Sequence, residues 1–158
     1  MNIIPSILEY NMSKDERFIS LAGECALKSD IFSRHGCILV VHGKPVSTGY
    51  NQLRNYSHDG IIQGYSCHAE MDALRNAIKR NVFSKRIPKS TMYITRFNRN
   101  GQYFEAKPCQ LCYSQMLKYG VHRVVYTQDN GQVESMRMQD YHPKYTTKGS
   151  LYKQTLTI

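Results

Sequence analysis

The chain has 158 residues, and its 21 lysines and arginines exceed its 12 acidic residues, which gives a formal net charge of +9. This length fits one domain that buries a core without disulfides, and a hydrophobic content of 41% excludes a disordered chain. Since no apolar run approaches the roughly 18 residues of a membrane span and residues 1–11 lack a secretory signal pattern, we expect a cytoplasmic protein with no membrane contact.

The first predicted element is an amphipathic helix over residues 14–29. Ser13 and Glu16 have the spacing of a capping box, and apolar residues recur behind them at helical intervals. A β-branched run and a turn at His42 to Pro45 then predict a β-hairpin over residues 36–50. A second helix begins at His68 and fades near Arg80.

The strand predicted over residues 91–95 is followed by Asn100-Gly101, a strong signal for a tight turn. Residues 96–105 are therefore predicted to lengthen this strand into a hairpin. Pro108 favours the start of a third helix, because proline is tolerated in a first helical turn, and Gly120 ends it.

Two strands close the pattern, over residues 123–127 and 132–138. The turn residues Asp129-Asn130-Gly131 lie between them, so the last strand, the fifth of the sheet, is expected to run antiparallel to its predecessor. The whole order predicts an α/β fold, in which helices cover both faces of one mixed five-stranded sheet. We expect a single domain over residues 1–158, with its core at about 14–141 and a basic tail at 142–158.

Two short motifs carry the chemistry of this sequence: His68-Ala69-Glu70 and Pro108-Cys109-Gln110-Leu111-Cys112. Both lie at predicted helix starts, where unpaired N–H groups and partial positive charge favour a thiolate, the form of cysteine that binds metal. The five cysteines are an odd number, and clustered cysteines without an export signal indicate a metal before disulfides. One imidazole and two thiolates are three zinc ligands, which leaves a fourth position for water, and Glu70 could move its protons.

This pattern resembles the cytidine/deoxycytidylate deaminase superfamily, whose signature is H-x-E followed by P-C-x-x-C. The resemblance covers about residues 14–127 and implies a three-layer α/β/α cytidine-deaminase-like fold. It implies a hydrolase that acts on the C–N bond of a cyclic amidine, with one Zn²⁺ per chain held by His68, Cys109 and Cys112. In the family, zinc activates a water that attacks C4 of cytosine or C6 of adenine, and Glu70 would shuttle the protons.

The resemblance also implies substrate contacts. Gly49-Tyr50-Asn51 looks like the family segment whose asparagine holds the sugar, and that role is carried over to Asn51. Ala69 lies between the ligand and the acid, and Lys107 places a cation beside the pocket where many relatives have Glu or Ser. The loop with Arg34 and His35 borders the pocket in this family, although a plain surface pair is an equal alternative.

Two structural alternatives stay open. A closed zinc site that only holds the fold would need a fourth ligand, and Cys67 is the nearby candidate. The interval of 37 residues between Glu70 and Pro108 is longer than the family commonly uses. The excess coincides with the hairpin at 96–105, which either projects near the rim of the active site or is a surface insertion.

The positive charge is concentrated between Arg75 and Lys107, a range that contains nine basic residues and only one acid, Glu105. Aromatic residues are interleaved with them, and cations next to aromatic faces are what single-stranded nucleic acid binds. A mononucleotide phosphate, which needs only one or two cations, and a solvated basic face are the alternatives.

The predicted function is zinc-dependent hydrolytic deamination of a cytosine base in a nucleoside or nucleotide of the cytidine or dCMP type, which releases ammonia and gives the uracil product. The first alternative is a deaminase that acts on a base in single-stranded DNA or RNA. The second is a non-catalytic zinc-containing module that binds nucleic acid. Relatives often form oligomers, so a homo-oligomer is compatible with each hypothesis.

Overall fold

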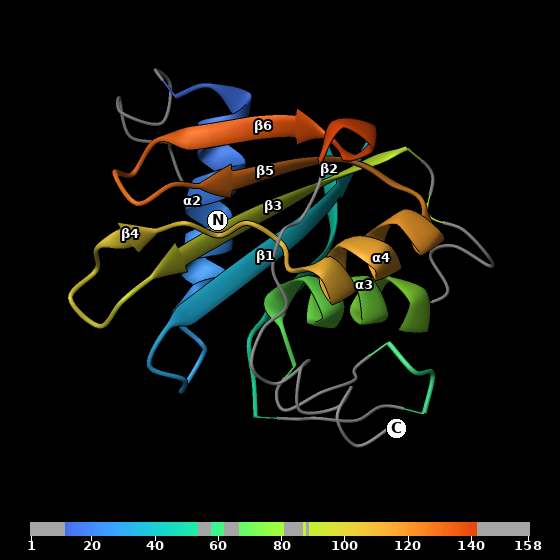
Figure 1. Cartoon of the computed structure of the whole chain (residues 1–158), viewed down its shortest axis with the longest axis horizontal. Coiled ribbons are helices and arrows are strands. Elements are labelled where there is room, and N and C mark those ends of the chain that lie inside the picture. Colours follow the sequence, from blue (N-terminus) through green and yellow to red (C-terminus); the bar gives the residue numbers. More distant parts are fainter. Residues whose placement is uncertain (1–11, 54–57, 62–66, 81–86, 88, 142–158) are drawn as a thin grey trace, which may run out of the picture.

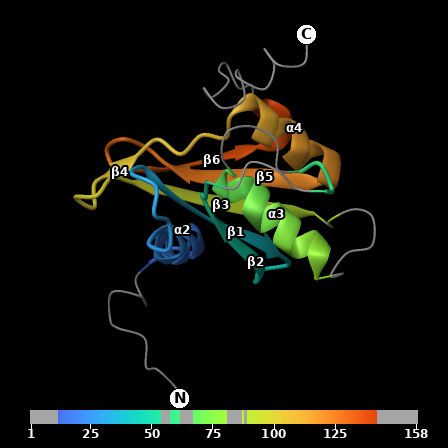
Figure 2. The same ribbon diagram turned by 90° about the horizontal axis from the view of Figure 1, so that it is seen from below.

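The computed structural model of the chain describes residues 12–53, 58–61, 67–80, 87 and 89–141. These residues form three layers, with one helix on one face of a mixed sheet and two helices on the other (Figures 1 and 2). The described helices are α2 (Lys14–Ala26), α3 (Ala69–Lys79), α4 (Gln110–Tyr119) and the short 3-10 turn η1 (Met138–Asp140). The described strands are β1 (Arg34–Val41), β2 (Lys44–Tyr50), β3 (Ser90–Phe97), β4 (Tyr103–Phe104), β5 (Val121–Thr127) and β6 (Val133–Arg137). The α/β class and the three-layer arrangement are therefore confirmed.

The sheet has the order β2-β1-β3-β5-β6, and β4 pairs with β3 outside this path. β1 is antiparallel to both β2 and β3, whereas β3 and β5 are parallel, which makes the sheet mixed. β6, which is the strand expected over residues 132–138, pairs antiparallel with β5 from Arg123↔Arg137 to Thr127↔Val133. The antiparallel direction of this last strand is confirmed.

The hairpin expected over residues 96–105 is also confirmed, and it adds a sixth strand to the five that were predicted. β4 pairs antiparallel with β3 through Arg96↔Phe104 and Phe97↔Tyr103. Asn98 closes the turn, because its Oδ1 accepts hydrogen bonds from the backbone of Asn100 and Gln102. Gly101 has a φ of 78°, a left-handed conformation that favours glycine.

Helix α2 begins as the capping box predicted. The Ser13 hydroxyl accepts a hydrogen bond from the backbone N–H of Glu16 at 3.1 Å, and the Glu16 carboxylate accepts one from the backbone of Ser13. The helix ends at Ala26, earlier than the predicted residue 29. It packs so closely on β1 that a Cβ at Gly36 would lie 1.9 Å from the backbone oxygen of Ala22.

Helices α3 and α4 cover the opposite face over the larger part of the core, and Figure 2 shows them on the side away from α2. α3 starts directly after His68, and α4 starts directly after Cys109 and ends at Gly120, whose φ is 96°. Cys25 and Cys37 are buried thiols in the core. None of the described helices is long and apolar enough to cross a membrane.

Candidate metal centre and active site

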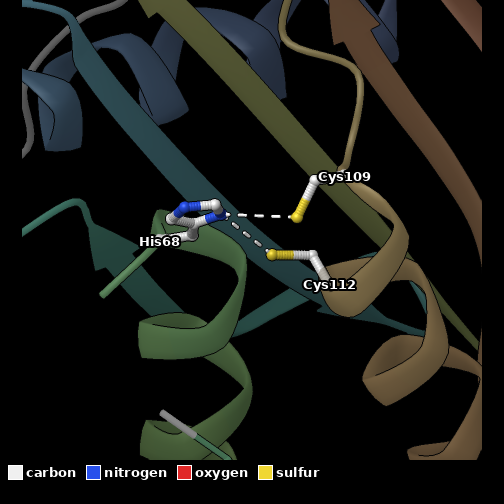
Figure 3. A group of neighbouring side chains, drawn as sticks. All are labelled: His68, Cys109 and Cys112. Carbon is white, nitrogen blue, oxygen red and sulfur yellow. Dashed lines mark hydrogen bonds between the residues drawn. The ribbon is translucent and has the colours of Figure 1, made fainter. Parts of the chain in front are cut away.

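Three side chains that are distant in sequence meet at the starts of α3 and α4. The Nδ1 atom of His68 lies 3.2 Å from Sγ of Cys112 and 3.6 Å from Sγ of Cys109, and Figure 3 shows both sulfurs facing this edge of the imidazole. One ligand atom of each residue lies within 4.8 Å of the others. The two sequence motifs therefore form one cluster, as predicted.

The positions of His68 and Cys109 at helix starts leave their side chains available to bind a metal. His68 and Cys109 occupy the N-cap positions with extended backbone, and neither side chain caps its own helix. A hydrogen bond with Cys112 lowers the pKa of Cys109 to about 4; burial opposes this shift, and the imidazole of His68 supports it. The same hydrogen bond and burial raise the pKa of Cys112. One thiolate is thus favoured before any metal binds.

The donor set fits zinc. Two sulfurs and one imidazole nitrogen are typical zinc ligands, and the chain contributes three of them, as in zinc sites that keep one position for a water or substrate. Cys67 does not belong to this group. Its thiol contacts the carbonyl oxygen of His68 at 3.4 Å, and its backbone forms a bridge with Gln52. The described residues therefore favour an open three-ligand site over the closed alternative.

Glu70 lies in the first turn of α3, and only 4% of its surface is exposed. Burial raises the pKa of the Glu70 carboxyl; the nearby His68 opposes this shift, and the charge of Cys109 adds to it. The net direction is upward, so this carboxyl holds its proton more readily than an exposed glutamate does. A carboxyl in such a position can both take and return a proton during a reaction.

The strand ends beside this cluster supply a second wall. Odd-numbered residues of β1 from Cys37 to Val41 belong to the core under α3 and α4, so alternation places His35 on the same face. Arg96 pairs with His35 across β1 and β3. Burial and the charges of Arg96 and His68 lower the pKa of His35 to about 3, so its imidazole is neutral at physiological pH.

Asn51 is buried and holds the segment that leads into β1. Its Nδ2 donates to the carbonyl of Ser33 at 2.7 Å, and its Oδ1 accepts from the backbone N–H of His35 at 2.9 Å. Nδ2 also lies 3.4 Å from Nδ1 of His35. Asn51, the predicted sugar-binding residue, therefore connects the end of β2 to the loop that borders the site through these hydrogen bonds.

Arg34 is not brought to the cluster. The even-numbered residues Ile38 and Val40 pack against α2, and a Cβ at Gly36 would meet Ala22 of that helix. The same alternation directs Arg34 to the α2 face, where its Nε is buried with no hydrogen-bond partner among the described residues. The predicted contact of Arg34 with substrate is not supported by this arrangement.

The remaining predicted substrate residues flank the cluster in the chain. Ala69 is fully buried as the first residue of α3, and β2 approaches so closely that a Cβ at Gly49 would lie 2.5 Å from its oxygen. Lys107 is two residues before Cys109, with its Nζ 3.8 Å from a carboxylate oxygen of Glu105 and its side chain 37% exposed.

Two residues that shape the site, Arg96 and Asp72, were not predicted as site residues. The Nε atom of Arg96 donates to Ser33 Oγ at 2.8 Å, and its Nη1 donates to the Glu105 carbonyl at 3.1 Å. Asp72 accepts a hydrogen bond from the backbone N–H of Tyr50 at 3.1 Å and so joins β2 to α3. The sequence signal for Asp72 was an acid two residues after Glu70 in the first turn of the predicted helix. No such local signal exists for Arg96, because its role depends on the pairing of β1 with β3.

Among the described residues, the basic side chains between Arg75 and Lys107 are spread over separate parts of the fold. Arg75 of α3 forms an ion pair with Asp59 at 3.2 Å. Lys89 instead lies directly before β3. Arg99 lies over the ring of Phe32, with its guanidinium carbon 5.2 Å from the ring centre. Lys85 and Arg86 are outside the described residues.

Residues 12–128 match the family model of the cytidine and deoxycytidylate deaminase zinc-binding region. A search of the curated proteins found no match. Three solved structures place the fold among known deaminases. The cytidine deaminase from Burkholderia pseudomallei is 22% identical, with 83% of this chain and 98% of that chain covered at a TM-score of 0.60.

The dCMP deaminase from cyanophage S-TIM5 in its apo form is also 22% identical, with 72% of this chain and 82% of that chain covered at a TM-score of 0.52. A chain from a study of A-to-I editing by tRNA:A34 deaminases is 19% identical, covers 73% of this chain and 78% of its own, and has a TM-score of 0.50. At these identities, the similarity establishes the shared fold.

Proposed function

Because the chain belongs to the cytidine and deoxycytidylate deaminase family, we propose that it catalyses zinc-dependent hydrolytic deamination of a cytosine base in a nucleoside or nucleotide. The observation that carries this proposal is the meeting of His68, Cys109 and Cys112 beside the buried Glu70. Water would replace the amine at C4, which leaves a uracil base and releases ammonia.

His68, Cys109 and Cys112 are the residues that would hold the zinc ion. When bound, zinc acts as a Lewis acid and lowers the pKa of a coordinated water to about 7. The lowered pKa of Cys109 means that the chain presents one thiolate to the ion without first having to remove its proton at neutral pH.

Glu70 would move the protons of the reaction. Its carboxylate would accept a proton from the attacking water and return it to the ring nitrogen N3. It would then carry the proton of the new C4 hydroxyl to the amine, which leaves as ammonia. The raised pKa supports this role, because a carboxyl with a pKa nearer neutrality exchanges its proton more readily than an ordinary glutamate.

The wall formed by His35 and Asn51 would hold the sugar and the base. His35 is neutral, so one ring nitrogen can accept a hydrogen bond and the other can donate one. Ala69 begins α3, and its backbone N–H is one of the groups that no helical carbonyl accepts, so it could bind a base carbonyl. Lys107, two residues before Cys109, would supply a cation near the substrate.

A product screen tests the proposal. Zinc-loaded protein is incubated with cytidine, deoxycytidine, CMP, dCMP and the adenine counterparts, and mass spectrometry detects replacement of the amine by a carbonyl oxygen. We expect turnover of at least one cytosine monomer. Turnover of adenine substrates alone would contradict the proposed base. No turnover of any monomer would contradict a nucleoside or nucleotide substrate, and no turnover of single-stranded DNA and RNA oligonucleotides in the same assay as well would contradict the enzyme class.

A second candidate, a deaminase of single-stranded nucleic acid, is favoured by one group of side chains. Phe32, which is 65% exposed, lies under the guanidinium of Arg99. Tyr103 on the neighbouring hairpin is 39% exposed and contacts Phe97 with its ring centre 5.6 Å away. We call Phe32, Arg99 and Tyr103 the aromatic rim. Exposed rings and cations of this kind can stack bases and attract phosphates.

A further inference from the structure

A second pocket lies on the α2 face of the sheet, at the end opposite to the metal cluster. It has a volume of about 350 Å³ and forms where α2, β3 and β5 begin and β1 ends. The cluster instead lies near the first residues of β1 and the last residues of β3, so the two sites are separated by the length and thickness of the sheet. The pocket is lined by Lys14, Val40, His42, Gly43, Lys89, Ser90, Thr91, Tyr93, His122 and Arg123.

Basic side chains dominate this lining. Lys14, Lys89 and Arg123 carry positive charge, and His42 and His122 add two imidazoles. They come from the start of α2, the β1–β2 turn, the segment before β3 and the start of β5. Cations that converge on one hollow from separate segments raise the local positive potential, and low-dielectric walls focus it.

The acid next to this pocket offsets only part of the charge. Asp15 accepts hydrogen bonds from Nη2 of Arg123 at 2.7 Å and from the hydroxyl of Tyr93 at 2.8 Å. Arg123 is thus held in place by an ion pair, with a further bond from its Nε to Ser135 at 2.6 Å. The other two charged residues of the lining are Lys14 and Lys89. Among the described residues, no acid forms an ion pair with either of them.

The β1–β2 turn leaves room for the Lys14 ammonium. His42 and Gly43 both have positive φ, at 51° and 77°, and His42 is the one non-glycine described residue with this conformation. A Cβ at Gly43 would lie 3.2 Å from Nζ of Lys14, so the glycine keeps the space beside the ammonium open. The tight turn therefore brings His42 and Lys14 to the same side of the pocket.

We propose that this pocket binds a phosphate group. Its volume is near the lower end of the roughly 300–1,000 Å³ of small-molecule sites, which suits one phosphate with its immediate substituent. Two lysines, a fixed arginine and the Thr91 hydroxyl supply charge and hydrogen-bond donors for such an anion. The phosphate can belong to a free nucleotide or to the backbone of a nucleic acid, and the inference does not depend on the proposed reaction.

Binding to the zinc-loaded full chain tests this inference. Isothermal titration measures the affinity for tripolyphosphate, and fluorescence anisotropy measures that for a labelled single-stranded thymidine oligonucleotide. The variant Lys14→Glu/Lys89→Glu reverses two exposed charges of the pocket. Lys118→Glu, which reverses an exposed charge in the last turn of α4, is the matched control. Thermal unfolding verifies that both variants are folded.

We expect the double variant to bind at least one of these phosphate probes at least ~10-fold more weakly, a change of about 1.4 kcal/mol, and the control to bind as the wild type does. If only the affinity for tripolyphosphate falls in the double variant, the ligand is a free phosphate compound. If the affinity for the oligonucleotide falls, the ligand is the phosphate backbone of a nucleic acid. The inference is overturned if the wild type binds neither probe, if the double variant binds both probes as tightly as the wild type, or if Lys118→Glu weakens binding as much as the double variant does. Because binding is read without turnover, an inactive protein would count against the proposed function and leave this inference intact.

Discussion

The Nε atom of Arg96 donates a hydrogen bond to the Ser33 hydroxyl at 2.8 Å, although 63 residues separate the two in the chain. The same guanidinium binds the Glu105 carbonyl, so Arg96 joins the loop before β1 to the hairpin that leads to the metal-binding cysteines. Its charge also helps to keep His35 neutral. We infer that Arg96 is a positioning residue of the candidate active site.

Arg96→Lys should therefore impair substrate binding more than the chemical step. Lysine keeps the charge but cannot make both hydrogen bonds in the fixed geometry of a guanidinium. Because these bonds hold the loop before β1 against the hairpin, we expect their weakening to raise KM about tenfold, equivalent to about 1.4 kcal/mol of binding free energy, while kcat changes less. Steady-state kinetics on the substrate found in the product screen measures both values. A fall in kcat at unchanged KM would contradict the positioning role.

The cysteine variants test the ligand set. Cys109→Ser and Cys112→Ser should each lose most of the bound zinc, because an open site has only three protein ligands. Cys67→Ser should keep about one zinc per chain, since its sulfur faces the His68 carbonyl instead of the cluster. Elemental analysis of purified protein gives the occupancy. Equal loss of zinc in Cys67→Ser would support the closed structural site.

The pair of Asp15 and Arg123 predicts an acid-dependent part of the stability. Burial raises the pKa of Asp15, but hydrogen bonds from Arg123 and Tyr93 outweigh this and lower it below 3.8. Because the carboxylate is favoured in the fold, its contribution is complete above pH 3.8 and is lost as the pH falls through the lowered pKa.

Asp15→Asn should accordingly reduce the free energy of unfolding by about 1 kcal/mol at pH 7, a value kept low because both side chains are about one-third exposed. The difference from wild type should shrink below pH 3.8. Asp140→Asn is the matched control, because its partner Arg137 is 61% exposed and that pair should contribute little. Urea titrations at several pH values measure these differences, and a constant deficit down to pH 2 would argue against the ion pair.

The aromatic rim distinguishes a strand from a monomer as substrate. If single-stranded nucleic acid is the substrate, Phe32→Ala should weaken its binding by about 1–3 kcal/mol, the usual contribution of one stacked base. The same variant should leave turnover of cytosine monomers unchanged. Leu117→Ala, which removes an exposed apolar side chain from α4, is the control. Equal oligonucleotide affinity in all three proteins would remove the rim as support for the nucleic-acid alternative.

The parts of the fold with strong local signals could be predicted from sequence. The capping box at Ser13, the Asn100-Gly101 turn and the stop at Gly120 each act within a few residues, and all three appear as predicted. The metal cluster was predictable for another reason. Its two motifs have spacings that bring the ligands together once each motif begins a helix.

Features that depend on pairing between distant strands were not predictable. Arg34 and His35 are neighbours in sequence, but alternation along β1 directs them to opposite faces, and only the register with β3 shows which one faces the site. The same register brings Arg96 beside His35. The sequence shows the net charge of the segment from Arg75 to Lys107 but not how its charges are distributed over the surface. That distribution depends on the fold, because Arg75 and Lys89 lie on different sides of the sheet.

The variant Glu70→Gln tests whether Glu70 moves protons at a zinc site. Glutamine keeps the size and the hydrogen-bonding ability of the side chain but cannot exchange a proton. With both proteins loaded to equal zinc content, we expect the initial rate of uracil formation to fall about 10²–10⁴-fold, the usual contribution of general acid–base catalysis. A Glu70→Gln protein that holds zinc and forms the uracil product at the wild-type rate would contradict the proton-transfer role of Glu70.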